Sequence, residues 1–342
     1  MTVLVFSPNW LGDAVMALPA VADLRRHAAA GRLIVVARPG VAGLWQIAAG
    51  VDEVIVIPPA RGMARWRTLG ENADVLRRAG AGTAVLLPNS LHTALTARRA
   101  DIPERWGYRR GLRGWLLTRA IPRPRGIVHQ ADYYRHLVAA LGVANGPRAP
   151  RLDVPAAVVQ GAGRLLAAAG WTPGTGLLGV APGAAYGGAK RWPPDRFAAV
   201  AAQLAKTHGL VPVLVGSEAD RAVTCAIEAE LGKISGPDPR PRPINLAGGT
   251  DIPQLAGVMA LCAAFVSNDS GAMHLAAAVG APVVALFGPT DERVTAPLAP
   301  RVRVLTAAAW CRPCLLRECP LDHRCMTGLD AETVARAAGE LL

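Results

Sequence analysis

The stretch Ser267–Pro289, SNDSGAMHLAAAVGAPVVALFGP, constrains the fold of this chain more than any other. An apolar run of strand length, Val258–Val266, leads into it. A second run, Pro282–Phe287, is rich in the branched residues that strands favour. Between the two runs, apolar residues recur at helical spacing up to Gly280. The pattern predicts a strand, a tight turn, a helix and a second strand, which is one βαβ unit of a parallel sheet.

The turn of this unit, Asp269-Ser270-Gly271, lies at the carboxyl end of one predicted strand and the amino end of a predicted helix. Proteins of the α/β class bind phosphorylated ligands at such positions, because free backbone N–H groups and the helix dipole attract anions. Asp269 is also a good helix cap in an ordinary βαβ unit. The residues therefore leave two interpretations open, an anion site and a capped helix.

The rest of the chain repeats the alternation of strands and helices. In the first half we expect strands at Thr2–Ser7, Leu33–Ala37, Glu53–Ile57 and Thr83–Leu87, and helices near residues 14–27, 61–79 and 133–141. In the second half we expect strands at Leu177–Ala181, Leu210–Gly216 and Ile244–Leu246, and helices near residues 156–169, 195–208 and 220–231. This alternation predicts an α/β fold of parallel, doubly wound sheets. Because each half starts with a strand, a glycine-bearing loop and a helix, we predict two Rossmann-like domains facing each other across a cleft.

A linker rich in proline and arginine, Asn145–Pro155, separates the two halves. We therefore place an N-terminal domain at residues 1–155 and a second domain at residues 156–328. The last segment, 329–342, is predicted to form a helix that packs back toward the N-terminal domain. Asp101–Arg125 departs from the pattern, with glycines, prolines and aromatic residues among its arginines, and we interpret it as a long excursion on the surface of the first domain.

Charge and hydropathy limit the possible functions. The 342 residues carry a net charge of +12, from 37 Lys and Arg against 25 Asp and Glu. This balance suggests an anionic partner, although an arginine-rich composition alone produces it too. No apolar run approaches the ~20 residues of a membrane-spanning helix, and the N-terminus, MTVLVFSPNW, lacks the basic flank of a signal peptide. We therefore expect a cytoplasmic protein, and no nucleic-acid-binding module is visible.

Two charged residues follow strands at positions suited to catalysis. Asp13 could accept a proton from a hydroxyl group, although Asp is also common in the first turn of a helix. Lys190 ends a run of small residues, Gly183–Ala189, that would let the backbone approach a diphosphate. Its charge could stabilise a departing nucleotide without a metal ion, and a merely solvated lysine is the alternative. The chain has no Walker sequence, which excludes the usual nucleotide hydrolases.

Four segments together resemble a known family. They are NWLGDAVMALPA (Asn9–Ala20), LPNS (Leu87–Ser90), GAAYGGAKRWP (Gly183–Pro193) and NDSGAMHLAAAVGAPVVALFGP (Asn268–Pro289). Over nearly its whole length the chain is similar to the ADP-heptose:lipopolysaccharide heptosyltransferases of glycosyltransferase family 9, and above all to their heptosyltransferase II branch. The resemblance implies a GT-B fold with the acceptor on the first half and ADP-heptose on the second. It also implies an inverting, metal-independent transfer to a heptose of the Kdo–lipid A inner core.

The same resemblance implies roles for individual residues. Asp13 matches the general base, Lys190 the lysine that binds the diphosphate, and Asp269 the residue that holds the heptose hydroxyls. Two residues stand where a related branch has threonines near the phosphates, and four more are expected around the diphosphate and the nucleotide. These further donor-binding residues are Ala185 and Tyr186, followed by Glu218, Ser270, Gly271 and His274.

A cysteine-rich loop lies near the end of the second domain, with the spacing Cys311-x2-Cys314-x4-Cys319-x5-Cys325. Four thiols in this span indicate a structural zinc site, but the x5 spacing is wider than the usual x2–4. Reduced thiols and a disulfide are the alternatives. The transfer chemistry implied by the resemblance requires no cofactor, only ADP-heptose as co-substrate.

Nine arginines lie between Arg98 and Arg125, in the half expected to bind the acceptor. We expect Arg109, Arg110 and Arg113 to attract the carboxylates and phosphates of a heptosylated Kdo–lipid A acceptor, with the protein peripheral at the cytoplasmic face of the inner membrane. One alternative is the same donor chemistry with another acceptor, of the heptosyltransferase I type or a soluble metabolite. Another is a non-catalytic nucleotide-sugar binding protein, which would need no base. An RNA-binding protein is the most distant.

Overall fold

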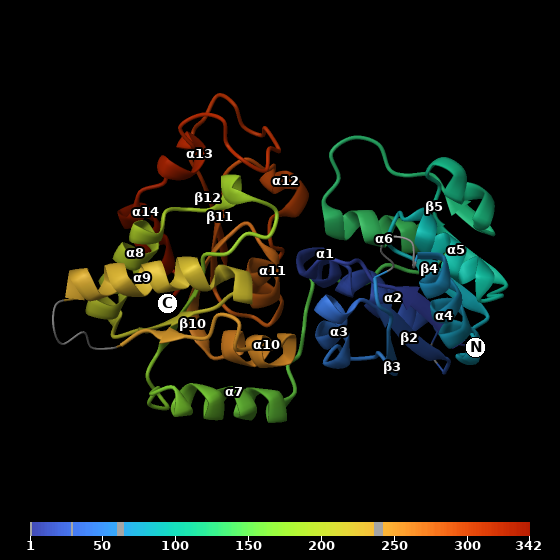
Figure 1. Ribbon diagram of the computed structural model, residues 1–342, viewed down its shortest axis with the longest axis horizontal. Helices are drawn as coiled ribbons and strands as arrows, with labels where there is room; N and C mark the ends of the chain where they lie inside the picture. The colour runs from blue at the N-terminus through green and yellow to red at the C-terminus, as the bar shows by residue number, and fades with distance from the viewer. Residues whose placement is uncertain (1, 29, 60–64, 236–241) are drawn as a thin grey trace. The chain divides into compact units, whose positions relative to one another are not determined.

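The computed structural model describes residues 2–28, 30–59, 65–235 and 242–342. The chain divides into two compact units, Met1–Asp153 and Val154–Leu342, each with its own sheet (Figure 1). The division falls inside the segment predicted as a linker. Because each unit has a separate core, each is described by itself.

The first unit is built on a six-stranded parallel sheet with the order β3-β2-β1-β4-β5-β6. Its strands are β1 (Thr2–Phe6), β2 (Arg32–Ala37), β3 (Glu53–Val56), β4 (Thr83–Leu86), β5 (Glu104–Tyr108) and β6 (Arg119–Ile121). β1 is central, and its Val5 lies opposite Val35 of β2 and Val85 of β4. An apolar side chain at each of these positions fits a strand that is covered by helices on both faces.

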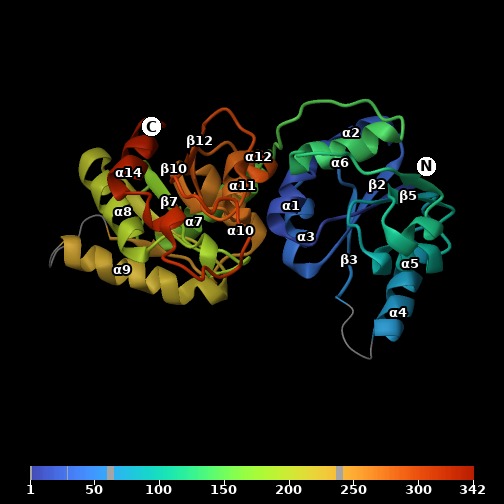
Figure 2. The ribbon, with the colours of Figure 1, turned by 90° about the horizontal axis from the view of Figure 1, so that it is seen from above.

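Helices cover both faces of this sheet, as a doubly wound fold requires (Figure 2). The helices are α1 (Leu11–Met16), α2 (Leu18–Ala28), α3 (Pro39–Gln46), α4 (Arg65–Arg78), α5 (Leu91–Arg99) and α6 (Gln130–Ala140), with a 3₁₀ helix η2 (Gly111–Leu116). α4 packs on α5, whereas α1, α2, α3 and α6 contact one another. The predicted helix near residues 61–79 is confirmed from Arg65, and residues 61–64 lie outside the described part of the chain.

The second unit has a six-stranded parallel sheet with the order β12-β11-β10-β7-β8-β9. Its strands are β7 (Leu177–Ala181), β8 (Val211–Leu214), β9 (Ile244–Asn245), β10 (Cys262–Asn268), β11 (Val283–Phe287) and β12 (Val302–Thr306). Read from the β9 edge, the strands follow the same sequence order as in the first unit. Both sheets thus have the classical Rossmann order, which confirms the predicted α/β class with two Rossmann-like domains.

Two helix layers also cover the second sheet (Figure 1). The helical segments are α7 (Ala156–Ala168), η3 (Gly188–Lys190), α8 (Pro194–His208), η4 (Glu218–Asp220), α9 (Arg221–Ser235), α10 (Ile252–Ala260), α11 (Gly271–Ala278), α12 (Glu292–Thr295), α13 (Arg324–Thr327) and α14 (Ala331–Gly339). α14 buries Val334 and Ala338 in the second core, against α8 and strands β10 to β12. Its predicted approach to the N-terminal domain stays a prediction.

Three sequence-based predictions need correction. Asp101–Arg125 is not only a surface excursion, because it forms strand β5 and the edge strand β6 and fully buries Tyr108. The predicted strand Val258–Val266 starts at Cys262, because Asp251 caps a helix that runs to Ala260. The single helix predicted near residues 14–27 is two helices, α1 and α2. The edge strand β12 was not predicted.

Candidate active site

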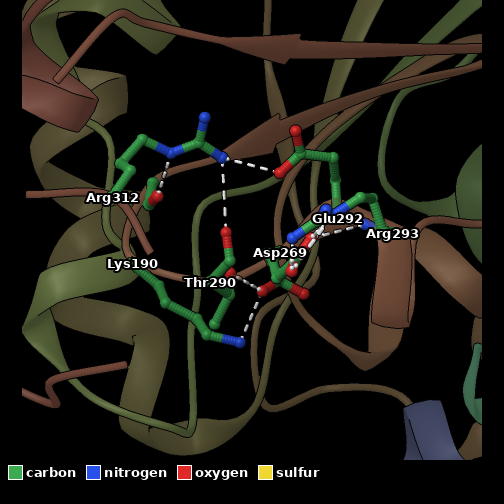
Figure 3. A network of polar contacts seen from close by, with 8 residues as sticks. Lys190, Asp269, Thr290, Glu292, Arg293 and Arg312 are labelled. Atoms are coloured by element: carbon green, nitrogen blue, oxygen red, sulfur yellow. Dashed lines mark hydrogen bonds and ion pairs between the residues drawn. The ribbon is translucent and has the colours of Figure 1, made fainter. Parts of the chain in front are cut away.

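Lys190 and Asp269 form an ion pair in the second unit, with Lys190 Nζ 2.5 Å from Asp269 Oδ2 (Figure 3). Lys190 ends η3, which follows β7, and Asp269 directly follows β10. β7 and β10 are neighbouring parallel strands, so their carboxyl ends meet at one edge of the sheet. The strand order reverses between them. This switch point is where open α/β sheets bind ligands.

The ion pair is largely shielded from water, since the side chains of Lys190 and Asp269 are only 12% and 5% exposed. Charges with so little solvent need partners with good geometry. Thr290, which follows β11, supplies one, because its Oγ1 donates to Asp269 Oδ2 at 2.5 Å. One carboxylate oxygen of Asp269 therefore accepts from two donors. Thr290 was missed in the sequence, where no motif marks it.

Asn268 joins the two loops that carry this pair. Its side chain is fully buried. Its Nδ2 donates to Pro182 O at 2.7 Å, and its Oδ1 accepts from Trp192 N at 3.1 Å. Pro182 and Trp192 flank the loop that ends in Lys190. A buried amide with both ends bonded therefore holds that loop against the end of β10, which explains why Lys190 reaches Asp269.

Helix α11 begins at Gly271, and its N-cap residue is Ser270 rather than Asp269. The Ser270 side chain makes no capping hydrogen bond, and its Oγ lies 3.3 Å from Ser267 Oγ. The interpretation of Asp269 as a helix cap is therefore wrong. The first N–H groups of α11 lack a side-chain cap, which is the condition for an anion site at a helix N-terminus.

The remaining donor candidates differ in how near they lie to this pair. Tyr186 lies beside it, with Lys190 Nζ 4.8 Å from the centre of its ring, and Ala185 is exposed in the same loop. His274 is buried within α11. Glu218 is exposed and forms its ion pair with Arg221 at 2.7 Å. The structure therefore brings Tyr186 to Lys190, while Glu218 has a different charged partner.

In the first unit, Asp13 lies in the first turn of α1, as predicted for a residue after the first strand. Its Oδ1 accepts a hydrogen bond from the hydroxyl of Tyr134 in α6 at 3.2 Å. Burial and the neighbouring Asp13 raise the pKa of Tyr134 well above its ordinary value, so the hydroxyl stays protonated. Tyr134 was missed because it is 121 residues from Asp13 and stands in an ordinary helical pattern.

The three arginines expected at the acceptor side are placed differently. Arg109 and Arg110 are exposed. Arg113 is fully buried, and its Nη1 donates to Pro88 O at 2.8 Å and to Asn89 Oδ1 at 3.1 Å. Burial lowers the pKa of Arg113 to about 10. The prediction of Arg113 as a surface residue is therefore wrong, because its buried side chain bonds the loop after β4.

All four cysteines of the Cys-rich loop, Cys311–Cys325, are free thiols. Burial and the nearby Cys311, Cys314 and Cys319 raise the pKa of Cys325. Over residues 2–28, 30–59, 65–235 and 242–342, no three His, Cys, Asp or Glu side chains are placed to hold a metal ion. The disulfide alternative is therefore not realised in the structure.

Known proteins provide a separate line of evidence. A model of glycosyltransferase family 9 (heptosyltransferase) matches residues 71–324. Lipopolysaccharide heptosyltransferase 2 of Salmonella typhimurium is 33% identical over 319 residues, which cover 89% of this chain and 88% of that protein. The structure of ADP-heptose lipopolysaccharide heptosyltransferase II of E. coli is 28% identical, with a TM-score of 0.84 over 100% of this chain and 98% of that chain. The E. coli heptosyltransferase WaaC with ADP-2-deoxy-2-fluoro heptose shares the fold, at 19% identity and a TM-score of 0.71 over 100% of both chains.

Two doubly wound Rossmann-like units with these neighbours define a glycosyltransferase of the GT-B class. The predicted fold and enzyme class are therefore confirmed. The chain belongs to glycosyltransferase family 9, the heptosyltransferases. In the part of the chain that the structure describes, no helix is both long and apolar enough to cross a membrane.

Proposed function

We propose that this protein transfers L-glycero-D-manno-heptose from ADP-heptose to a heptose of the lipopolysaccharide inner core, as a heptosyltransferase II. The observation that carries the donor half is the shielded Lys190–Asp269 pair at the switch point of the second sheet. It lies beside the uncapped N-terminus of α11. A cation, a carboxylate and free N–H groups are together suited to a sugar attached to a diphosphate.

In this proposal, different residues of the donor site bind different parts of the nucleotide sugar. Lys190 and the N–H groups at Ser270 and Gly271 take the diphosphate, with His274 and the backbone of Ala185 and Tyr186 around it. Asp269 accepts hydrogen bonds from heptose hydroxyls, and Glu218 approaches the nucleotide. Asp269 pairs with the charge of Lys190 in the structure. When the diphosphate arrives, Lys190 exchanges part of this contact for the phosphate oxygens, so no metal ion is required for charge neutralisation.

The acceptor half depends on Asp13. The acceptor hydroxyl oxygen bonds to C1 of heptose from the face opposite ADP, while Asp13 removes the hydroxyl proton. The bond between C1 and the ADP oxygen breaks, and its electron pair goes to the diphosphate. Lys190 and the N-terminus of α11 stabilise this charge. The configuration at C1 is thereby inverted.

The first unit offers suitable acceptor-binding chemistry. A pocket at the carboxyl ends of β1, β2 and β4 is lined by Asn9, Arg38, His92 and Thr93, among others, and none of the described residues that line it is acidic. Arg109 and Arg110 are exposed in the same unit, and the net charge is +12. These features support an anionic acceptor, a heptosylated Kdo–lipid A, met at the cytoplasmic face of the inner membrane by a peripheral protein.

A donor panel and an acceptor panel test the function. Calorimetry should show tighter binding of ADP-heptose than of ADP-glucose, UDP-glucose or GDP-mannose. Transfer, followed by mass spectrometry, should add one heptose to heptosylated Kdo–lipid A and should continue in EDTA. Equal affinity for all four nucleotide sugars would contradict the assignment of ADP-heptose as the donor. Transfer to Kdo–lipid A without a first heptose, or only to a soluble sugar, would show that the acceptor is not heptosylated Kdo–lipid A.

A further inference from the structure

The Cys-rich loop contacts both segments of the proposed donor site. Arg312 of this loop is 14% exposed, and its guanidinium reaches the segment after β11. Its Nε donates to Gly288 O at 2.6 Å and its Nη2 to Thr290 O at 3.3 Å. The same Nη2 lies 2.9 Å from Glu292 Oε2. One side chain thus binds three acceptors in the short segment Gly288–Glu292.

This segment is bonded directly to the site. Thr290 Oγ1 donates to Asp269, and Asp269 pairs with Lys190. Figure 3 shows the continuous path from Arg312 through Thr290 to Asp269 and Lys190, with Glu292 on the far side of the guanidinium. Among the described residues, Arg312 bonds Gly288, Thr290 and Glu292 rather than Lys190 or Asp269 themselves. It therefore acts on the site only through the position of Thr290.

The loop also binds the other donor segment, the one after β7. Arg317 O accepts from Ala189 N at 2.9 Å, and Glu318 Oε1 accepts from Gly188 N at 3.0 Å. Leu315 O accepts from the Tyr186 hydroxyl at 2.7 Å. A Cβ at Gly187 would lie 2.3 Å from Arg317 O, so the two backbones meet at closest approach. The Cys-rich loop therefore binds both the loop that carries Lys190 and the segment that carries Thr290, the hydrogen-bond donor to Asp269.

We propose that Arg312 is a positioning residue that sets the sugar selectivity of the donor site. Arg312 holds the Gly288–Glu292 segment so that Thr290 binds one oxygen of Asp269, which leaves the carboxylate oriented for heptose hydroxyls. A planar guanidinium suits this role, because its five N–H donors are spread over three nitrogens in fixed directions, whereas the three donors of a lysine share one rotatable nitrogen. The inference rests on the proposed function, since it assigns the heptose to Asp269.

The test is the affinity ratio between ADP-heptose and ADP, measured by calorimetry. In Arg312→Gln, Thr290 is released, so the Kd of ADP-heptose should rise roughly tenfold, in the range for loss of one hydrogen bond to a charged group. The Kd of ADP should stay within about twofold, because Lys190 and α11 remain. Arg312→Lys should retain only part of the selectivity.

A matched control and a second variant keep the test independent of folding. Arg293, next to Glu292, is exposed, and among the described residues its side chain bonds Asp291 (Figure 3). Arg293→Gln should therefore leave the affinity ratio unchanged. Thr290→Val keeps the backbone but removes the hydroxyl, and it should reproduce the loss seen in Arg312→Gln. The double variant should lose no more than either one, because both act through one contact.

Two results would overturn the positioning role. One is a normal affinity ratio in both Arg312→Gln and Thr290→Val. The other is an equal loss of ADP and ADP-heptose affinity in Arg312→Gln, which would indicate a general disturbance of the loop. Failure of the proposed function is distinguishable, because the wild-type protein would then show no preference for ADP-heptose over other nucleotide sugars.

Discussion

The two units have the same strand order but carry residues of opposite charge after equivalent strands. Asp13 follows β1, the central strand of the first sheet, and Lys190 follows β7, its counterpart in the second. Asp13 is bonded to a neutral hydroxyl, that of Tyr134. Asp269, at the end of β10, is bonded to a cation, Lys190. The same edge of the same fold thus presents a carboxylate in two different electrostatic settings.

This difference shows how one architecture serves two tasks. Asp269 faces a cation from which water is largely excluded, which suits the binding of a charged ligand. Asp13 accepts from a hydroxyl that orients its carboxylate. We propose that the first unit removes the acceptor proton and that the second unit binds the charged donor. Each prediction below tests one side of this contrast.

The largest effect should come from Asp13→Asn in the first unit. Asparagine keeps the size of the side chain and can still accept from Tyr134, but it cannot take a proton. Turnover should fall by about 10²–10⁴, while calorimetric affinity for ADP-heptose stays unchanged. Asp74→Asn, on the exposed side of α4, is the control and should turn over normally. Near-normal turnover in Asp13→Asn would show that Asp13 is not the base, and it would contradict the proposed difference between the two units.

In the second unit, Lys190→Ala should raise the Kd of ADP by about 10–100-fold, because the diphosphate loses a charge-assisted contact. Asp269→Ala should weaken ADP-heptose but not ADP. The ion pair adds a further expectation, that ADP binds Asp269→Ala at least as tightly as the wild type, since Lys190 is no longer shared. Lys206→Ala, at an exposed position of α8, serves as the charge control. If both site variants bound both ligands normally, the donor site would have to lie elsewhere.

Tyr134→Phe should have an intermediate effect. The change removes the hydroxyl that orients Asp13 but keeps the buried ring, so we expect kcat to fall about tenfold, the cost of losing one hydrogen bond to a charged group. Donor Kd should not change. Tyr133→Phe removes a hydroxyl from the same helix that accepts from Asn89, and it should have a smaller effect on kcat. An equal kcat in the wild type, Tyr134→Phe and Tyr133→Phe would show that Asp13 does not require the hydroxyl of Tyr134.

The smallest effect concerns the arginines. Replacing Arg109 and Arg110 with Gln should raise the acceptor KM several-fold, most at low salt, because exposed charges act within a Debye length. The pair Arg67→Gln and Arg78→Gln removes the same charge from α4 and is the control. Arg113→Gln should instead lower the thermal stability, since it breaks buried bonds to Pro88 and Asn89. An acceptor KM that is insensitive to salt would favour a soluble acceptor.

The sequence by itself determined the elements and their alternation. β7 runs from Leu177 to Ala181 as predicted, and the βαβ unit around Asp269 is present, because strand and helix patterns depend on neighbouring residues. Doubly wound sheets follow from that alternation through general rules of chain connection. Asp13 and Lys190 could be singled out because both lie just after strands, where such folds bind ligands.

Only the tertiary structure decided which of these residues meet. The order of strands brings β7 beside β10, and thereby Lys190 to Asp269, although a long stretch of chain separates them. The same applies to Tyr134 with Asp13 and to Arg312 with Thr290. Burial was decided there too, since the sequence presents Arg113 as one surface arginine among many, whereas in the structure it is buried and bonds Pro88 and Asn89. Local patterns carry no information on such pairs, because contacts between distant segments depend on the packing of the whole sheet.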